Sequence, residues 1–187
     1  MSEIYFIRHG KTQWNLDGRL QGQTDVPLAE VGKDQVIEFI PQLKNLGLEK
    51  IVSSSLQRTF ETGKILAEAY AIPIEIKNEL IERSFGSFEG LTRETLMKDH
   101  GLKAEERLSG VLPDDAESLE SVGNRVWPII EECIAKEQKI LLVSHAGVFR
   151  ALWETRPVQG VFIELKFGQI WKISNNGTVW NFDTLTQ

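Results

Sequence analysis

The sequence lacks the features that mark secreted, membrane-bound and nucleic-acid-binding proteins. Cys133 is the only cysteine among 187 residues, so no disulfide can form within the chain. No apolar run is long enough for a transmembrane helix, and the N-terminus enters a strand-like pattern without the regions of a signal peptide. The formal net charge of −6 argues against a basic face for nucleic acid or a membrane surface. We therefore expect a cytoplasmic protein that binds neither nucleic acid nor a membrane.

Several catalytic motifs are also missing. The position six residues after Cys133 holds Lys139 rather than arginine, so the phosphate-binding loop of cysteine phosphatases is absent. The three histidines have no close carboxylate partners in the sequence, which argues against a two-metal site. There is no Walker loop and no Gly-x-Ser-x-Gly turn. The common cysteine, two-metal and serine routes to hydrolysis therefore fit this chain badly.

What the sequence does contain is an alternation of strand-like and helix-like segments. The 41% hydrophobic and 26% charged content is that of an ordinary globular protein, and the length suits one domain over residues 1–187. The apolar pattern predicts strands at about 4–8, 50–53, 72–76, 139–144, 168–174 and 178–183. It predicts helices at about 28–46, 56–70, 118–136 and 147–153. This alternation predicts an α/β sandwich around a largely parallel sheet.

The connections between these elements carry their own signals. Residues 10–28 read as one long polar loop, and loops of that length are usually functional. Ser54 and Ser55 are predicted N-caps of the helix that follows. The charged, helix-prone residues 83–117 interrupt the alternation, and we interpret them as a small helical lid inserted into the domain. The Asn-Asn-Gly at 175–177 predicts a hairpin between the last two strands.

Polar side chains follow four of the predicted strands. Arg8 and His9 follow the first strand, Arg58 follows the second at a short distance, Glu82 follows the third and His145 follows the fourth. Parallel sheets bind their ligands outside the carboxyl ends of the strands. The sequence therefore predicts that these five side chains meet at one edge of the sheet.

This set of residue types suits phosphoryl chemistry. Arginine offers a planar fork of donors that matches phosphate oxygens, and Arg58 and Ala146-Gly147 lie at helix starts that favour an anion. A neutral histidine attacks phosphorus when its other ring nitrogen is held as a donor. A buried carboxyl group gives a proton to the leaving oxygen and then takes one from water. We therefore interpret the cluster as an anion pocket with a histidine nucleophile and Glu82 as the candidate acid.

Five motifs in order carry a family resemblance. RHGKTQWN, LQGQTDVPL, SSSLQRTFET, ERSFGSFEG and SHAGVFRAL resemble the motif set of the histidine phosphatase superfamily, the phosphoglycerate mutase-like enzymes. The resemblance implies a three-layer α/β/α sandwich, no metal and no organic cofactor. It implies that His9 is phosphorylated in turnover, within a pocket completed by Arg8, Arg58 and His145. It also implies substrate contacts by Asn15 and Gln21 and proton donation by Glu82.

The resemblance leaves three functions open. The preferred one is a phosphatase, a phosphomonoesterase that acts on a small phosphorylated metabolite through phospho-His9. The alternative is a phosphoglycerate mutase, and the third is an inactive module that binds a phosphorylated ligand. The family's mutases carry a long tail that shields the phosphohistidine, whereas here only NFDTLTQ remains at the last strand, which favours hydrolysis.

Further details stay open at the level of sequence. The stretch Asp115-Ala116-Glu117-Ser118 departs from the Gly-Gly-Glu-Ser that is typical of the family's phosphatases. Arg19 and Arg83 either contact a second anionic group or are solvated, and we favour solvent. The substrate is not named by any motif, and sugar phosphates, ribazole phosphate, phosphoserine and aryl phosphates all fit. Dimers are common in the family, so a homodimer is also compatible with the sequence.

Overall fold

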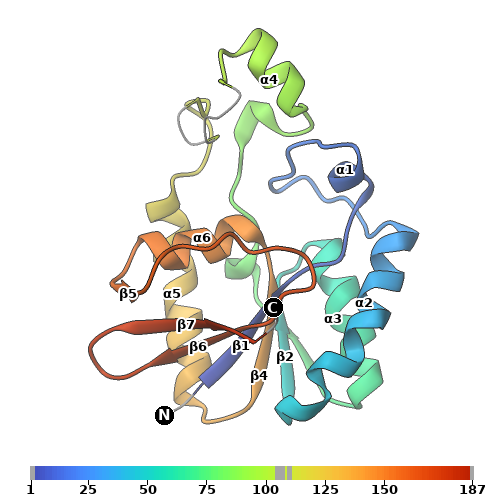
Figure 1. The fold of residues 1–187 in the computed structure, drawn as a ribbon, viewed down its shortest axis with the longest axis vertical. Helices are drawn as coiled ribbons and strands as arrows, with labels where there is room; N and C mark the ends of the chain where they lie inside the picture. The colour runs from blue at the N-terminus through green and yellow to red at the C-terminus, as the bar shows by residue number, and fades with distance from the viewer. Residues whose placement is uncertain (1–2, 104–107, 109–110, 186–187) are drawn as a thin grey trace.

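The computed structural model describes residues 3–103, 108 and 111–185 (Figure 1). The strands are β1 (Glu3–Arg8), β2 (Lys50–Ser53), β3 (Ile74–Ile76), β4 (Ile140–Ser144), β5 (Val158–Gln159), β6 (Trp171–Asn175) and β7 (Trp180–Thr184). The helices are α1 (Gln13–Leu16), α2 (Glu30–Leu43), α3 (Gln57–Tyr70), α4 (Arg93–Asp99), α5 (Leu119–Ala135) and α6 (Ala146–Glu154). Short 3₁₀ helices are η1 (Lys44–Leu46), η2 (Asn78–Leu80) and η3 (Gly86–Phe88). None of the helices in these described ranges is long and apolar enough to cross a membrane.

The strands form one sheet in the order β3-β2-β4-β1-β6-β7-β5. Strands β3, β2, β4 and β1 run parallel to one another. Only β6 runs against them, since β1 and β7 are both antiparallel to it and β5 is parallel to β7. The predicted α/β fold with a largely parallel sheet is therefore confirmed.

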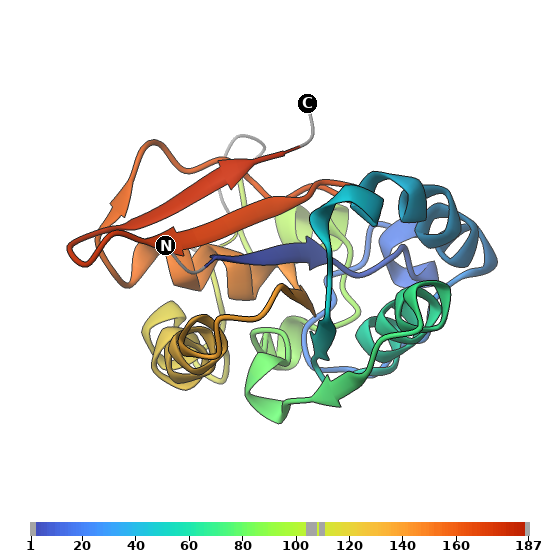
Figure 2. The same cartoon turned by 90° about the horizontal axis from the view of Figure 1, so that it is seen from below.

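Helices cover both faces of this sheet (Figure 2). Along β1, Ile4 and Phe6 point into a core built with α5 and α6, whereas Tyr5 and Ile7 point into a core built with α2 and α3. This alternation follows from the period of two along a strand. Because both faces are covered, the central strands are apolar on both sides, as in β4, where all five residues are buried.

The predicted elements are nearly all present, with three differences. Helix α3 has Leu56 as its N-cap without a side-chain cap, so the prediction that Ser54 and Ser55 cap it is wrong. The predicted loop 10–28 contains α1, capped by Thr12. Strand β5 was not predicted, because two residues are too few to show a strand pattern. Its pairing with β7 holds it in the sheet.

Helix α4, within the segment 83–117, lies beyond one end of the sheet, on the same side as α1 (Figure 1). The described residues of the segment contain η3, α4 and a small apolar cluster of Phe88, Leu96 and Leu102. Residues 104–107 and 109–110 of this segment lie outside the described residues. The segment therefore has its own minor core, while its role as a lid stays a prediction.

Candidate active site

His9 lies directly after β1, and its backbone continues the sheet. Its N–H donates to the carbonyl of Ser144 at 3.1 Å, which fixes it beside the end of β4. Its ring Nδ1 lies 2.6 Å from the carbonyl of Gly10. A carbonyl only accepts, so Nδ1 carries the proton and Nε2 keeps its lone pair in the neutral ring. Burial, with Arg8 and Arg58 nearby, holds the pKa of His9 well below its usual value, so the ring is neutral near pH 7.

The backbone after His9 is held in place by its close approach to α2 and α3. The N–H of Gly10 donates to Oγ1 of Thr62 at 3.0 Å, and that hydroxyl donates to the carbonyl of Arg58 at 2.7 Å. A Cβ at position 10 would lie 2.6 Å from the carbonyl oxygen of Gly32. Position 10 therefore requires glycine for steric reasons, and one hydroxyl ties the histidine turn to the arginine helix.

Two arginines lie near this turn, Arg58 fully buried and Arg8 partly buried. The guanidinium of Arg58 donates through Nη2 to the carbonyl of Gly22 at 2.6 Å and through Nη1 to the carbonyl of Thr24 at 3.0 Å. Burial lowers the pKa of Arg58 to about 10, and it stays charged. The guanidinium of Arg8 lies 3.9 Å from the ring centroid of Phe167. The protein therefore orients Arg58 through its two Nη groups and Arg8 through the ring of Phe167. The Nε groups of both arginines take no part in these contacts.

His145 stands at the end of β4, with its ring 5.2 Å from that of His9. Its Nε2 lies 2.8 Å from Oγ of Ser54, which lies 2.7 Å from Oγ1 of Thr59. The Thr59 hydroxyl donates to the carbonyl of Leu56 at 2.7 Å, so Ser54 donates to Thr59 and accepts from Nε2 of His145. Burial and the nearby Arg58 hold the pKa of His145 well below its usual value. Ser54 therefore orients this histidine instead of capping a helix.

Glu82 is the buried carboxyl group of the site. Its Oε1 accepts from the N–H of Arg83 at 2.8 Å, and its Oε2 accepts from the N–H of Gly147 at 3.2 Å. A Cβ at position 147 would lie 2.3 Å from Oε1, so the carboxyl group requires glycine there. Burial raises the pKa of Glu82. The two backbone N–H donors oppose that rise, and so do the positive charges of Arg58 and Arg8. The Gly147 N–H is thus occupied by Glu82, whereas the sequence predicted it as a substrate contact.

The first loop brings the predicted polar residues to the same region. Oγ1 of Thr12 donates to Oε1 of Gln21 at 2.7 Å, and Oδ1 of Asn15 accepts from the backbone N–H of Thr12, the N-cap of α1, at 3.1 Å. Asn15 and Arg8 line one cavity of about 310 Å³. Ala146 and Gly147 line another of about 420 Å³. The predicted residues are therefore gathered at the carboxyl edge of the parallel strands.

The hydrogen bonds of this region leave a specific set of atoms unpaired. Among the buried side-chain nitrogen and oxygen atoms of the described residues, four lack a hydrogen-bond partner: Arg8 Nε, Gln21 Nε2, Arg58 Nε and His145 Nδ1. All four belong to residues that the sequence predicted for the site. Because an unsatisfied buried polar group costs roughly 1–3 kcal/mol, this concentration marks the place where a ligand would be stabilised most.

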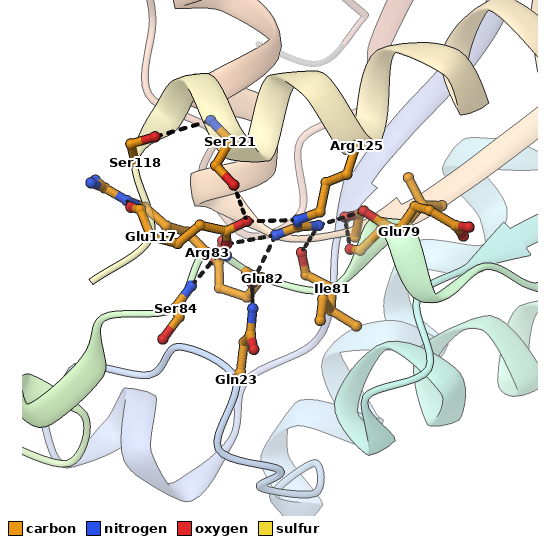
Figure 3. Close-up of polar contacts among 12 residues, drawn as sticks. Gln23, Glu79, Ile81, Glu82, Arg83, Ser84, Glu117, Ser118, Ser121 and Arg125 are labelled. Atoms are coloured by element: carbon orange, nitrogen blue, oxygen red, sulfur yellow. Dashed lines mark hydrogen bonds and ion pairs between the residues drawn. The ribbon is translucent and has the colours of Figure 1, made fainter. Parts of the chain in front are cut away.

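Several residues of the site were not predicted from the sequence. Phe167 covers Arg8 and packs edge-on to His9 with ring centroids 6.0 Å apart, yet it lies in an irregular segment without periodicity. Arg83 was expected in solvent, but it is only 8% exposed and its Nε donates to the carbonyl of Glu117. Arg125, on the exposed side of a predicted helix, contacts the chain around Glu82 (Figure 3). No local pattern signals these contacts.

No group of three or more His, Cys, Asp or Glu side chains that could hold a metal ion is found among the described residues. Cys133 is buried in α5, and burial raises the pKa of its thiol to about 11. His100 is exposed beside Phe88, with ring centroids 4.5 Å apart. Cys133 therefore lies in the core and His100 at the surface.

Two histidines and two arginines at the carboxyl edge of such a sheet define a protein of the phosphoryl-transfer class. The chain belongs to the histidine phosphatase superfamily (branch 1), whose family profile matches residues 4–174. It is 33% identical over 160 residues to a protein named probable phosphoglycerate mutase GpmB of Escherichia coli O1:K1, which covers 83% of this chain and 74% of that one. The resemblance of the five motifs is confirmed.

Solved structures show the same fold. A mycobacterial glucosyl-3-phosphoglycerate phosphatase in complex with VO3 superposes with a TM-score of 0.85 at 26% identity, over 98% of both chains. An alpha-ribazole phosphatase from Shigella flexneri has a TM-score of 0.76 at 24% identity, over 99% of this chain and 96% of that one. The family and the 26% identical phosphatase support an enzyme of the phosphatase or mutase type.

Proposed function

We propose that the protein is a phosphomonoesterase that hydrolyses a small phosphorylated metabolite through phosphorylation of His9, without a metal. The observation that carries the proposal is the set of four unpaired buried nitrogens, on Arg8, Gln21, Arg58 and His145, around a histidine with a free Nε2. A phosphoryl group brings several acceptor oxygens, and charge-assisted bonds from arginine to them are strong.

In the first step, Nε2 of His9 attacks phosphorus and the bond from phosphorus to the leaving oxygen breaks. The protonated carboxyl group of Glu82 gives its proton to that oxygen, and the raised pKa of Glu82 supports this role. In the second step water attacks phosphorus, Glu82 takes the proton and the bond from phosphorus to His9 breaks. The arginines stabilise the charge on the equatorial oxygens throughout.

His145 acts on the same oxygens in this proposal. Its Nε2–H is used by Ser54, so Nδ1 donates only when the ring is protonated. A bound phosphoryl dianion raises the pKa of a neighbouring histidine, because the opposite charge favours the imidazolium form. His145 therefore takes up a proton as the substrate binds, whereas His9 stays neutral as a nucleophile must.

The experiment is release of phosphate from an aryl phosphate in the presence of EDTA, for the wild type, His9→Ala and His100→Ala. We expect activity that survives EDTA, is lost in His9→Ala and is kept in His100→Ala, since His100 is exposed and lies away from the cluster. The wild type should also accumulate an acid-labile phosphoprotein that His9→Ala lacks. Activity that EDTA abolishes would contradict the metal-free route.

A phosphoglycerate mutase is the second candidate, favoured by the 33% identical Escherichia coli relative named probable phosphoglycerate mutase GpmB. It predicts interconversion of phosphoglycerate isomers and a phosphoenzyme that water attacks slowly. Assaying isomerisation and phosphate release on the same sample separates the two functions. A protein that binds phosphorylated ligands but does neither would be the inactive module.

A further inference from the structure

A network of charged side chains lies behind Glu82, on the side of α5 (Figure 3). Nη1 of Arg125 donates to the carbonyls of Glu79 and Ile81, the latter at 2.8 Å, and its Nη2 donates to the carbonyl of Glu82 at 3.1 Å. Its Nε and Nη2 also donate to the two carboxylate oxygens of Glu117, at 2.9 and 3.0 Å. All five guanidinium N–H groups therefore have an acceptor.

Three of these five bonds go to the backbone that carries Glu82. Residues 79–82 lie at the end of η2 and after it, and no strand or helix pairs the carbonyls of Glu79, Ile81 and Glu82. The rigid, planar guanidinium of Arg125 donates to all three of these carbonyls. A lysine at this position offers three donors on one flexible nitrogen, so it keeps the charge but cannot reproduce the geometry.

Glu117 links Arg125 to the backbone on the other side of Glu82. Its carboxylate accepts from the N–H of Ser84 at 3.2 Å, and its own N–H donates to the carbonyl of Ser84 at 3.0 Å. Its carbonyl accepts from Nε of Arg83. Hydrogen bonds between Ser84 and Glu117 thus join the two ends of the inserted segment, two residues after Glu82. Arg125 forms an ion pair with the partly buried carboxylate of Glu117.

Gln23 of the first loop holds the Glu82 backbone from the opposite direction. Its Nε2 donates to the carbonyl of Glu82 at 3.1 Å, the same oxygen that accepts from Arg125. The loop around Gln23 is itself fixed by Glu89, which accepts from the N–H groups of Gln23 and Thr24 at 2.9 and 2.8 Å. The Glu82 peptide is therefore held from both sides.

We propose that Arg125 and Glu117 are positioning residues for Glu82, which set the place of its carboxyl group through the backbone of residues 79–84. The proposal rests on the proposed role of Glu82 as proton donor. The carboxyl group lies in a tight space, because a single Cβ at Gly147 would collide with it. A small shift of its backbone therefore moves it away from the leaving oxygen, and misplacement by about 1 Å costs about 100-fold in rate.

The kinetic test compares Arg125→Lys and Glu117→Gln with the matched pair Arg156→Lys and Glu131→Gln. Arg156 and Glu131 form another arginine–glutamate pair that also uses α5, and among the described residues neither side chain forms a hydrogen bond with residues 79–84. Each variant is assayed with an aryl phosphate and an alkyl phosphate, since only the alkoxide leaving group needs a full proton. We expect kcat/KM for the alkyl ester to fall about 10- to 100-fold more than for the aryl ester in the first pair, and equally in the control pair.

A second measurement does not depend on turnover. The carboxyl carbon of Glu82 is followed by NMR in protein labelled with ¹³C-glutamate, with its signal identified by its loss in Glu82→Gln. In the wild type burial raises the pKa of this carboxyl group above 4.5, with Arg8 and Arg58 as the charged groups that face it. In Arg125→Lys, which keeps the positive charge, we expect that pKa to move toward 4.5 because the loosened backbone lets water reach the carboxyl group.

The outcomes separate this inference from the proposed function. An unchanged pKa of Glu82 in Arg125→Lys, or equal losses with both esters that follow the folded fraction in thermal unfolding, would overturn the positioning role. A wild type that hydrolyses neither ester would refute the proposed function, while the shift of the Glu82 pKa would still decide whether Arg125 positions the carboxyl group.

Discussion

At the residue scale, the site concentrates groups that are costly to bury. Arg8 and Arg58 lie close enough that each lowers the pKa of His9, and Glu82 is the carboxyl group whose charge acts most strongly on both. Like charges in a poorly solvated place repel one another, and an anion relieves that repulsion. The folded protein therefore holds its cations in a state that a phosphoryl group stabilises more than water does.

The proton donor gives the first prediction at this scale. Glu82→Gln should lower kcat for an alkyl phosphate about 100-fold and lower kcat for an aryl phosphate less than about tenfold, because only the alkoxide requires a full proton. In the wild type, kcat for the alkyl ester should also fall as pH rises through the raised pKa of Glu82, and this dependence should vanish in the variant.

The matched control is Glu38→Gln, since Glu38 is an exposed glutamate on α2. It should leave both rates unchanged. Equal slowing of the two esters in Glu82→Gln would refute Glu82 as the acid, and an unchanged pH dependence would show that another group titrates.

At the element scale, strand order decides which side chains meet. Strands β1 and β4 are parallel neighbours with Arg8 opposite Ser144, so the residues that follow them, His9 and His145, must lie side by side. Their positions in the sequence are far apart, and only the pairing brings the rings to 5.2 Å. Ser144 is itself anchored, since its hydroxyl donates to the carbonyl of Leu80 at 2.8 Å, near the Glu82 segment.

The contact between β1 and α3 gives a prediction at this scale. Thr62→Val removes the hydroxyl that accepts from the Gly10 N–H and donates to the Arg58 carbonyl. The shape of the side chain is kept, but a buried N–H loses its acceptor. We expect the free energy of unfolding to fall by about 1–3 kcal/mol, measured by urea denaturation.

Thr178→Val is the control for that measurement. Thr178 is exposed in the turn between β6 and β7, and its backbone N–H keeps the side chain of Asn176 as its partner. Its effect should stay within about 0.5 kcal/mol. A Thr62→Val protein as stable as the control would mean that Gly10 finds another acceptor.

At the scale of the whole molecule, an acidic protein contains a cationic site. The net charge of −6 is that of the whole chain, whereas His9, Arg58 and His145 are buried at one edge of the sheet with Arg8 partly buried beside them. Among the described residues, the network of Arg125 and Glu117 and the contacts of Glu89 link this edge to the segment 83–117. The global charge therefore says little about the ligand, which the local arrangement selects.

The buried histidines predict how stability depends on pH. The folded-state pKa values of His9 and His145 lie well below 6.5, so the unfolded chain binds more protons below that pH and stability falls as pH drops. Each contributes a slope of about 1.4 kcal/mol per pH unit. Glu82 opposes them, because its raised pKa makes the folded state bind the proton first. We therefore expect the melting temperature to fall between about pH 6.5 and pH 5.

Thermal unfolding at several pH values checks this prediction. His145→Gln should show a shallower slope, since one buried neutral imidazole is gone. His100→Gln should keep the wild-type slope, because His100 is exposed. A flat profile in the wild type would mean that the imidazoles are protonated in the folded protein.

The parts of the fold that were predictable from the sequence are those with a strong local signal. Strand β4 is a run of apolar residues, α5 has apolar residues at helical spacing, and Gly47 ends η1 with a positive φ of 63° as a helix stop. Strand β5 and α1 were missed because they are too short to show a period. The capping role of Ser54 was assigned wrongly, since its hydroxyl serves His145 across the site instead.

The sequence by itself determined the family of the chain, through five ordered motifs, and the order of His9, Arg58, Glu82 and His145 after apolar strands. Burial of those strands follows from their composition, and residues placed after parallel strands must meet at one edge. Only the tertiary structure decided how each group is held. Arg125, Glu117 and Phe167 act across long stretches of chain, and such contacts depend on packing that no local pattern encodes.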